Sequence, residues 1–222
     1  MRAYLRDPDE IYRRSFEAAR RETDLASIPE DLADIALRLV HATAMPELVR
    51  DLRFSPGAGT AGQAALVSGA LIIADCKMVA DGIRSDLIKG RNEIICALDK
   101  PGTAAYASNR GTTRAAAGIA LARSRIDGGV IAIGNAPTAL FALLDLIEEG
   151  TGKPALILGF PVGFIGAAES KQALVDAEIG VPFITLAGRF GGSALAAAAI
   201  NALLIEIAAP EAVPAKAAAG AP

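Results

Sequence analysis

The sequence of 222 residues is poor in side chains that bind metals or form disulfides: it has one histidine, His41, and two cysteines, Cys76 and Cys96. Both cysteines stand in apolar runs, where a buried free thiol is the expected state. No paired histidines and no cysteine–histidine spacing indicate a metal site. We therefore expect neither a disulfide nor a tightly bound metal.

The sequence also lacks an excess of positive charge and a long apolar run. It has 22 basic and 25 acidic residues, and the basic ones are scattered, which argues against nucleic acid as a partner. The longest apolar stretch, 194–205, is mostly alanine and contains Asn201, so it is too short and too weakly hydrophobic to span a bilayer. The N-terminus has no apolar core of signal-peptide length. These absences predict a cytoplasmic protein that binds no membrane.

The composition, 52% hydrophobic and 21% charged, is that of a chain with a sizeable core. Its length favours a single α/β domain, which we place at residues 1–209, followed by an Ala- and Pro-rich flexible tail at 210–222. Two helices are expected first, one after Pro8 and one that opens at Pro29 and ends near His41. The sequence therefore begins with a helical segment of about 40 residues.

Short apolar runs alternate with alanine-rich helical patterns after residue 50. The expected strands are 52–54, 71–74, 94–97, 130–133, 155–158 and 183–186. The expected helices between and after them are 58–68, 113–124, 138–149, 167–177 and 191–207. This alternation, with strands that are apolar throughout, predicts a doubly wound, mostly parallel sheet with helices on both faces.

In such sheets the ligand lies at the carboxyl ends of the strands, so we expect the chemistry in the segments that follow each apolar run. These segments are rich in glycine and proline and comprise residues 55–57, 75–79, 134–138, 159–164 and 187–193. Basic residues on or near them are Arg53, Lys77, Arg84, Arg114, Lys171 and Arg189. Several converging cations would suit a substrate with many carboxylates, whereas each alone could be a solvated surface charge.

His41 is the first candidate for acid–base chemistry, because imidazole is the only side chain whose ordinary pKa lies near neutrality. The pattern places it where a helix gives way to a loop, ahead of Pro46. A structural histidine is the alternative, since helix C-termini attract imidazolium. Residue type and position alone leave both interpretations open.

The run from Gly57 to Gly62 matches the pattern G-x-G-x-x-G, with Asp81 about 20 positions further on. This arrangement is typical of a dinucleotide-binding turn. However, the preceding strand is short and contains Arg53, and a glycine-rich helix start also serves a carboxylate contact or close packing. No G-x-S-x-G motif indicates a serine hydrolase.

Taken in order and spacing, the segments resemble the precorrin-8X methylmutases of cobalamin biosynthesis. The most specific blocks are GNAPT at 134–138 and PVGFIGAAESK at 161–171. The other matching stretches are 11–16, 40–42, 54–56, 78–83, 92–96, 113–117, 132–141, 159–160 and 188–194. Together they span about residues 11 to 203, which is essentially the whole expected domain.

The resemblance implies a flavodoxin-like α/β homodimer that moves a methyl group of a corrinoid precursor from C11 to C12, giving hydrogenobyrinic acid. The family's catalytic histidine falls on His41, as a general acid, and a substrate-contacting serine falls on Ser15. The remaining expected substrate-binding residues are Ser55, Arg114, Asn135, Thr138, Gly163, Lys171 and Arg189. The reaction is intramolecular and redox-neutral, so the resemblance implies no cofactor and no metal.

Three positions depart from the family pattern, which leaves substrate contacts at Arg84, Ser85 and Thr112 open. Two other functions are considered beside the methylmutase. One is a nucleotide-dependent oxidoreductase that uses the turn from Gly57 to Gly62. The other is a tetrapyrrole-binding protein that holds the pigment without turnover.

Overall fold

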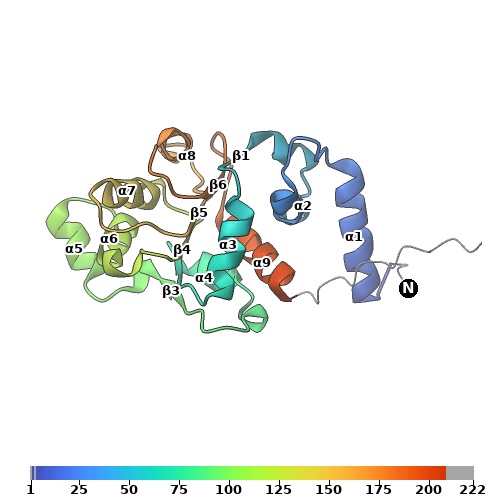
Figure 1. Cartoon of the computed structure of the whole chain (residues 1–222), viewed down its shortest axis with the longest axis horizontal. Coiled ribbons are helices and arrows are strands. Elements are labelled where there is room, and N and C mark those ends of the chain that lie inside the picture. The colour runs from blue at the N-terminus through green and yellow to red at the C-terminus, as the bar shows by residue number, and fades with distance from the viewer. Residues whose placement is uncertain (1, 3, 209–222) are drawn as a thin grey trace, which may run out of the picture.

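A six-stranded sheet forms the centre of the computed structural model, which describes residue 2 and residues 4–208 (Figure 1). The strands are β1 (Leu52–Phe54), β2 (Ile72–Ala74), β3 (Ile94–Cys96), β4 (Val130–Ile133), β5 (Leu156–Gly159) and β6 (Phe183–Leu186). Their spatial order is β1-β6-β5-β4-β2-β3. All neighbouring pairs are parallel except β1 with β6. The prediction of a mostly parallel sheet in an α/β fold is confirmed.

The central strands are buried at every position because both of their faces are covered. In β4, Val130 and Ala132 face one hydrophobic cluster, whereas Ile131 and Ile133 face the other. A strand buried on both faces needs no polar alternation, which explains its continuously apolar sequence. The predicted apolar runs agree with the observed strands to within about one residue at each end.

Helices pack on both faces of this sheet. One face is covered by α2 (Glu30–Thr43), α3 (Ala58–Val67), α4 (Lys77–Gly82) and α9 (Ser193–Ala208). The other is covered by α6 (Arg114–Leu121), α7 (Pro137–Glu148) and α8 (Ala167–Asp176), with α5 (Thr103–Arg110) against α6. Short 3₁₀ helices are η1 (Pro46–Asp51), η2 (Ser85–Leu87), η3 (Ala97–Asp99) and η4 (Arg123–Arg125).

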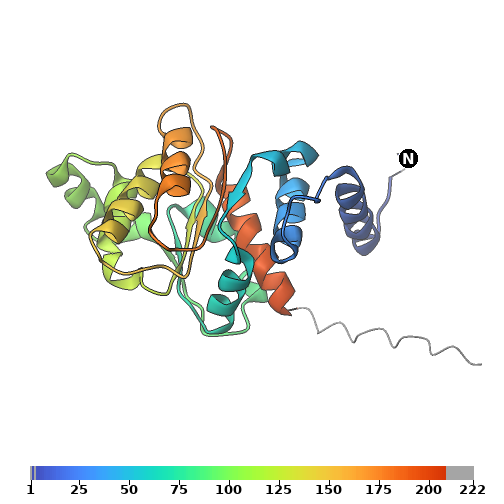
Figure 2. The ribbon, with the colours of Figure 1, turned by 45° about the horizontal axis from the view of Figure 1, so that its top comes forward.

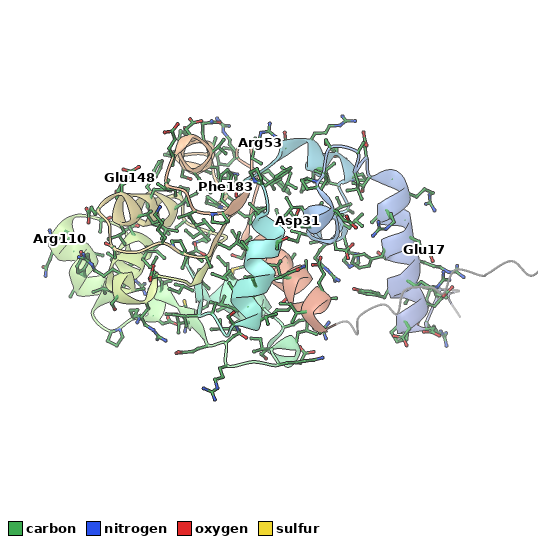
Figure 3. The ribbon with its side chains drawn as sticks, viewed as in Figure 1. Glu17, Asp31, Arg53, Arg110, Glu148 and Phe183 are labelled. Carbon is green, nitrogen blue, oxygen red and sulfur yellow. The ribbon has the colours of Figure 1, made fainter. Side chains whose placement is uncertain are left out.

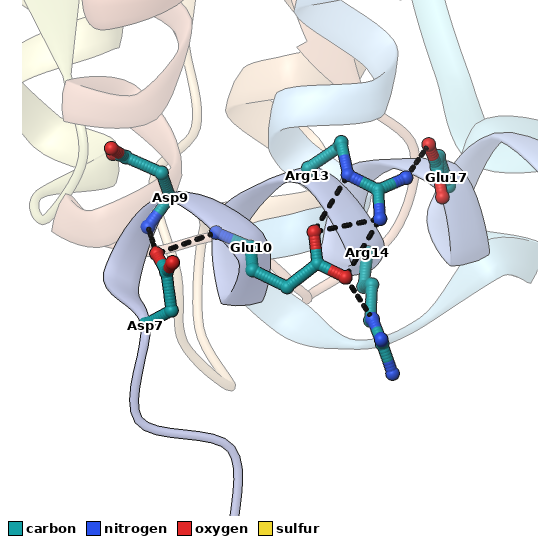
Figure 4. A network of polar contacts seen from close by, with 6 residues as sticks. All are labelled: Asp7, Asp9, Glu10, Arg13, Arg14 and Glu17. Atoms are coloured by element: carbon teal, nitrogen blue, oxygen red, sulfur yellow. Dashed lines mark hydrogen bonds and ion pairs between the residues drawn. The ribbon is translucent and has the colours of Figure 1, made fainter.

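Helix α1 (Pro8–Glu22) lies outside α2, at the far side from the sheet (Figures 1 and 2). None of its residues is buried. Asp7 caps it by accepting the N–H groups of Asp9 and Glu10, and Arg13 bridges Glu10 and Glu17 along its surface (Figure 4). Such exposed pairs add little stability, so α1 depends on its contact with α2.

No helix within residues 4–208 combines the length and the apolar character needed to cross a membrane. The tail predicted at 210–222 lies outside the described residues.

Candidate active site

Three loops meet at the carboxyl rim, by which we mean the side of the sheet where the five parallel strands end. They follow β4, β5 and β6 and carry Asn135, Gly163 and Arg189 respectively. The N–H of Val162 donates to the carbonyl of Asn135 at 3.5 Å, and the N–H of Gly163 donates to the carbonyl of Arg189 at 3.3 Å. The structure thus brings together three of the residues expected to bind substrate.

Gly163 has a backbone conformation that side chains disfavour. Its φ is +150°, and no atom lies within 4 Å of the position that a Cβ would occupy. Glycine is therefore required by the path of the chain and not by lack of space. The residues that follow, Phe164 and Ile165, are 86% and 90% exposed. The guanidinium of Arg189 lies 5.7 Å from the ring centroid of Phe164, so a cation and an apolar surface stand side by side at this rim.

Asp75 follows β2 directly and is only 1% exposed. Its carboxylate accepts the backbone N–H groups of Gly134, Asn135 and Ala136 at 3.0, 3.0 and 2.8 Å. Burial raises the pKa of Asp75, and the three N–H donors oppose that rise. The carboxylate therefore fixes the backbone that carries Asn135 and leads into α7. Sequence reasoning placed Asp75 in a strand-end segment but gave it no role.

Thr138 is linked to Thr113, the residue before Arg114, through a pair of hydroxyl groups. The Oγ1 atoms of Thr113 and Thr138 lie 2.7 Å apart. Thr113 also caps α6, because its Oγ1 accepts the N–H of Ala116 at 3.2 Å. Arg114 is the first residue of α6, so this contact fixes the N-termini of α6 and α7 beside one another.

Lys171, which the resemblance places among the substrate-binding residues, is only 1% exposed, so it is not the solvated surface charge that was the alternative. Its Nζ donates to the carbonyl of Phe190 at 2.6 Å, which ties α8 to the loop after β6. Burial lowers the pKa of Lys171 to about 8, and the nearby charge of Asp51 opposes this shift. The ammonium group therefore binds the backbone of the loop that carries Arg189.

Three other candidate cations form hydrogen bonds or ion pairs with nearby residues of the chain. Arg53 donates to the carbonyls of Arg50 and Leu52 at 2.9 Å each. Lys77 lies 3.4 Å from Asp99, and Arg84 lies 2.6 Å from Asp86. Lys77, Arg114 and Arg189 stand on segments at the carboxyl rim, and Lys77 is paired there with Asp99.

His41 occupies the last turn of α2 and is exposed. Its Nδ1 lies 3.0 Å from the Oγ of Ser15 on α1, so two residues 26 positions apart form one polar pair. The imidazole also stacks on Phe16, with ring centroids 4.6 Å apart and planes inclined by 24°. Partial burial, and next the positive charge of Arg38, lower the pKa of His41. A cavity of about 190 Å³ opens beside this pair.

Ser55 lies at the opposite rim of the sheet. Its Oγ accepts the N–H of Phe183, the first residue of β6, at 3.0 Å. The expectation that residues 55–57 join the other strand-end segments is wrong, because β1 runs antiparallel to β6 and ends where β6 begins. Ser55 thus closes the pairing of these two strands.

Gly59 and Gly62 are required by packing. A Cβ on Gly59 would lie 1.9 Å from the carbonyl oxygen of Asp31, and one on Gly62 would lie 2.6 Å from Leu156. The Asp31 side chain, between α2 and α3, accepts the N–H of Thr60 at 3.2 Å (Figure 3). The N-terminus of α3 therefore already faces a carboxylate of its own chain, which leaves the dinucleotide interpretation without an open anion site.

Polar groups at the carboxyl rim of a mostly parallel sheet, together with an exposed histidine–serine pair on the two N-terminal helices, define an α/β protein with a candidate site for an anionic ligand. Residues 10–206 match the model of the precorrin-8X methylmutase family. The chain belongs to this family of isomerases in cobalamin biosynthesis, which confirms the resemblance predicted from the sequence.

Two relatives and one solved structure show how far the likeness extends. The precorrin-8X methylmutase of Pseudomonas aeruginosa is 52% identical over 91% of this chain and 98% of its own length. The cobalt-precorrin-8 methylmutase of Priestia megaterium is 42% identical over 89% of this chain and 88% of its own. A crystal structure of precorrin-8X methylmutase from Thermus thermophilus superposes with a TM-score of 0.82 at 38% identity, covering 90% of this chain and 96% of that one.

Proposed function

We propose that this protein converts precorrin-8X into hydrogenobyrinic acid by moving a methyl group from C11 to C12, with His41 as the general acid. The observation that carries the proposal is the 3.0 Å contact between Nδ1 of His41 and Oγ of Ser15. When the imidazole is protonated, both ring nitrogens are donors. Ser15 then accepts from Nδ1, and the proton on Nε2 is directed to the substrate.

The chemistry suits a single proton donor. Protonation of a ring nitrogen makes the conjugated macrocycle electron-poor and favours a suprafacial shift of the methyl group. The more extended chromophore of the product supplies the driving force. A positioned acid of this kind contributes roughly 10² to 10⁴ in rate. A lowered pKa makes the His41 imidazolium a stronger acid toward the substrate nitrogen.

The carboxyl rim supplies the expected contacts to the carboxylate arms of the substrate. We place Arg114 and Arg189 as the charged anchors, with Asn135, Thr138 and the backbone at Gly163 beside them. Lys171 supports this surface by holding the carbonyl of Phe190. Ser55 lies at the opposite rim, so we assign it to the strand pairing and not to the substrate.

The functional unit that we propose is a homodimer in the cytoplasm. The cavity of about 190 Å³ beside His41 is smaller than the roughly 300 to 1,000 Å³ typical of small-molecule sites. Helix α1 buries none of its residues within one chain, and Phe164 and Ile165 are exposed. A second copy would cover such surfaces and enlarge the crevice.

We assign the sheet to the flavodoxin-like class. Without the antiparallel β1, the strand order is β3-β2-β4-β5-β6, which corresponds to the 2-1-3-4-5 order of that class. After β3 is added on one side of β2, the later strands are added on the other side, so the topological switch point lies between the parallel strands β2 and β4. Asp75 and Asn135 follow these two strands, at the place where such sheets bind ligands.

We propose that the natural substrate is the metal-free macrocycle. The relative from Pseudomonas aeruginosa, named for precorrin-8X, is 52% identical, whereas the relative from Priestia megaterium, named for cobalt-precorrin-8, is 42% identical. Rates measured side by side with the metal-free and cobalt-containing substrates test this choice. A higher kcat/KM for the cobalt form would reverse it.

The decisive experiment compares the wild type with His41→Ala on precorrin-8X, followed by the visible absorbance of hydrogenobyrinic acid. The variant should lose at least about 100-fold in kcat while it still binds the pigment. Unimpaired turnover would remove His41 from the mechanism. Bound pigment without any spectral change in the wild type would indicate a carrier, and tight binding of a nicotinamide or flavin would indicate an oxidoreductase.

A further inference from the structure

Arg38 stands one turn before His41 on α2, and both contact the same aromatic ring. The guanidinium carbon of Arg38 lies 4.5 Å from the ring centroid of Phe16, and the His41 ring lies 4.6 Å from it. A cation this close to an aromatic ring is attracted to the negative face of the ring. Phe16 therefore links the arginine to the imidazole.

A second contact fixes the guanidinium in place. Nη2 of Arg38 donates to the hydroxyl of Tyr12 at 2.6 Å, and the Tyr12 ring lies 4.7 Å from that of Phe16. Nε of Arg38 is buried and has no hydrogen-bond partner among the described residues. A buried donor without a partner is unfavourable, so hydrogen bonding alone does not account for an arginine here.

We infer that Arg38 is a positioning residue for His41: it clamps Phe16 and Tyr12 of α1 against α2 and supplies a fixed positive charge that favours transfer of the imidazole proton to the substrate. This inference rests on the proposed role of His41. Ser15, the hydrogen-bond partner of His41, adjoins Phe16 in sequence, so the clamp also fixes the serine. Lysine could supply the charge but not the planar group that stacks on the ring.

Other charged groups near the two residues are few. Glu22 of α1 lines the cavity beside His41. Arg20 of α1, Asp34 of α2 and Glu206 of α9 line the cavity beside Arg38. Arg20 and Asp34 form an exposed ion pair at 3.1 Å, which leaves their combined charge near zero. Among the described residues, Arg38 is also the one charged residue whose field lowers the pKa of His41, after the larger effect of burial.

The test uses the fact that the chain contains one histidine. The pKa of His41 can be measured by NMR in the full-length protein without assignment, without substrate and without activity. Arg38→Gln keeps a donor for Tyr12 but removes the charge, so the pKa of His41 should rise. Arg38→Lys keeps the charge, so the pKa should stay near the wild-type value. Arg20→Gln is the matched control: it removes an exposed positive charge of α1 that does not contribute to the lowered pKa of His41, so it should shift that pKa less than Arg38→Gln does.

Turnover provides the second measurement. In Arg38→Gln, kcat for precorrin-8X should fall roughly tenfold with KM changed less than twofold, because an imprecisely held acid affects the chemical step more than binding. The fall of kcat toward high pH should move upward together with the pKa of His41. Tyr12→Phe, a change at a residue that is 46% exposed, should lower kcat by a smaller factor and keeps the test open if Arg38→Gln does not fold.

Three results would overturn the inference: an unchanged pKa of His41 in Arg38→Gln, equal shifts in Arg38→Gln and Arg38→Lys, or equal shifts in Arg38→Gln and Arg20→Gln. If Arg38→Gln does not fold, the inference would be overturned by a Tyr12→Phe variant in which both kcat and the pKa of His41 equal the wild-type values. These outcomes are distinct from failure of the proposed function. Full turnover by His41→Ala would disprove the catalytic role of the histidine, whereas the NMR titration reports on Arg38 in either case.

Discussion

The carboxylate of Asp75 accepts the backbone N–H of Ala136 at 2.8 Å, although the two residues are 61 positions apart and Asp75 is 1% exposed. With Gly134 and Asn135 as further donors, one side chain at the end of β2 holds the first three residues after β4. A buried carboxylate is costly unless it is hydrogen-bonded, and here three donors compensate the charge. The loop that carries Asn135 is therefore fixed before any ligand arrives.

Replacement of Asp75 by asparagine tests this relationship. The amide turns an NH₂ group toward backbone N–H donors, so Asp75→Asn should lower the free energy of unfolding by about 1 to 3 kcal/mol. Because the loop loosens, KM for precorrin-8X should rise. Urea unfolding and steady-state kinetics measure the two effects. Asp81→Asn, at an exposed position of α4, should change neither. A loss below about 0.5 kcal/mol in Asp75→Asn would contradict the assignment.

The glycines before and within α3 give a paired prediction. Gly59→Ala should destabilise by about 2 to 3 kcal/mol, because its Cβ would lie 1.9 Å from backbone atoms of α2 that have little room to move. Gly57→Ala should cost only about 1 kcal/mol, because its φ of +72° is strained for alanine but the space is open. Thermal unfolding of both variants measures which of the two substitutions destabilises the protein more. If Gly57→Ala were the more damaging change, packing would not explain this run.

Glu206 should make the stability of the protein depend on pH. Burial, with smaller contributions from Asp34 and Asp31, raises its pKa from 4.5 to about 7. A group whose pKa is higher in the folded state contributes stability at low pH that is lost as pH rises through the folded value. The free energy of unfolding should therefore fall as the pH rises from 4.5 to about 7.

Glu206→Gln should remove this dependence and stabilise the protein above neutral pH by roughly 1 kcal/mol, once screening of a half-exposed group is allowed for. Gln63, whose side-chain amide donates to Glu206, can still bond to the new amide oxygen. The difference between variant and wild type is measured by urea unfolding at pH 4 and pH 8. Glu149→Gln, at an exposed position, serves as control. A difference that does not grow with pH would refute the interpretation.

Lys171→Met should affect substrate affinity more than stability. The variant leaves the carbonyl of Phe190 without its donor, which costs about 1 to 3 kcal/mol. Relief from a buried charge offsets that cost, so the net change in stability should be small. The loop that carries Arg189 loses its tie to α8, and KM should rise several-fold with a smaller change in kcat. Lys153→Met, an exposed lysine, should leave KM unchanged.

The strands and the helices α3, α6, α7, α8 and α9 could be predicted because each strand is a short apolar run and these helices follow alanine-rich helical patterns. Helices α4 and α5 were not predicted, since such short segments carry little periodic signal. The direction of β1 could not be predicted, since a strand of three residues carries no signal that distinguishes parallel from antiparallel pairing. That one uncertainty misplaced Ser55. It also made the glycine run look like a ligand-binding turn.

At the candidate site, the sequence pointed to residues with reactive or charged side chains but not to those that act through a neighbour. Arg38 precedes His41 by three positions, a spacing that puts both on one face of a helix, and this signal was available in the sequence. Its contact with Phe16 depends on how α1 docks on α2 and has no sequence signature. The burial of Lys171 likewise depends on the path of the loop after β6.

The antiparallel direction of β1 determines at which rim of the sheet the segment after α2, the helix of His41, enters. Because β1 begins where β6 ends, the chain enters the sheet at the carboxyl rim, and the carbonyl of Asp51 accepts the N–H of Ala187 at 2.7 Å there. The end of α2 is therefore led to the same rim as Arg189. In a sheet with a parallel first strand, the same two N-terminal helices would end on the other side. A single inverted edge strand thus brings the segment after α2 and the segment after β6, which lie far apart in the sequence, to one rim of the sheet.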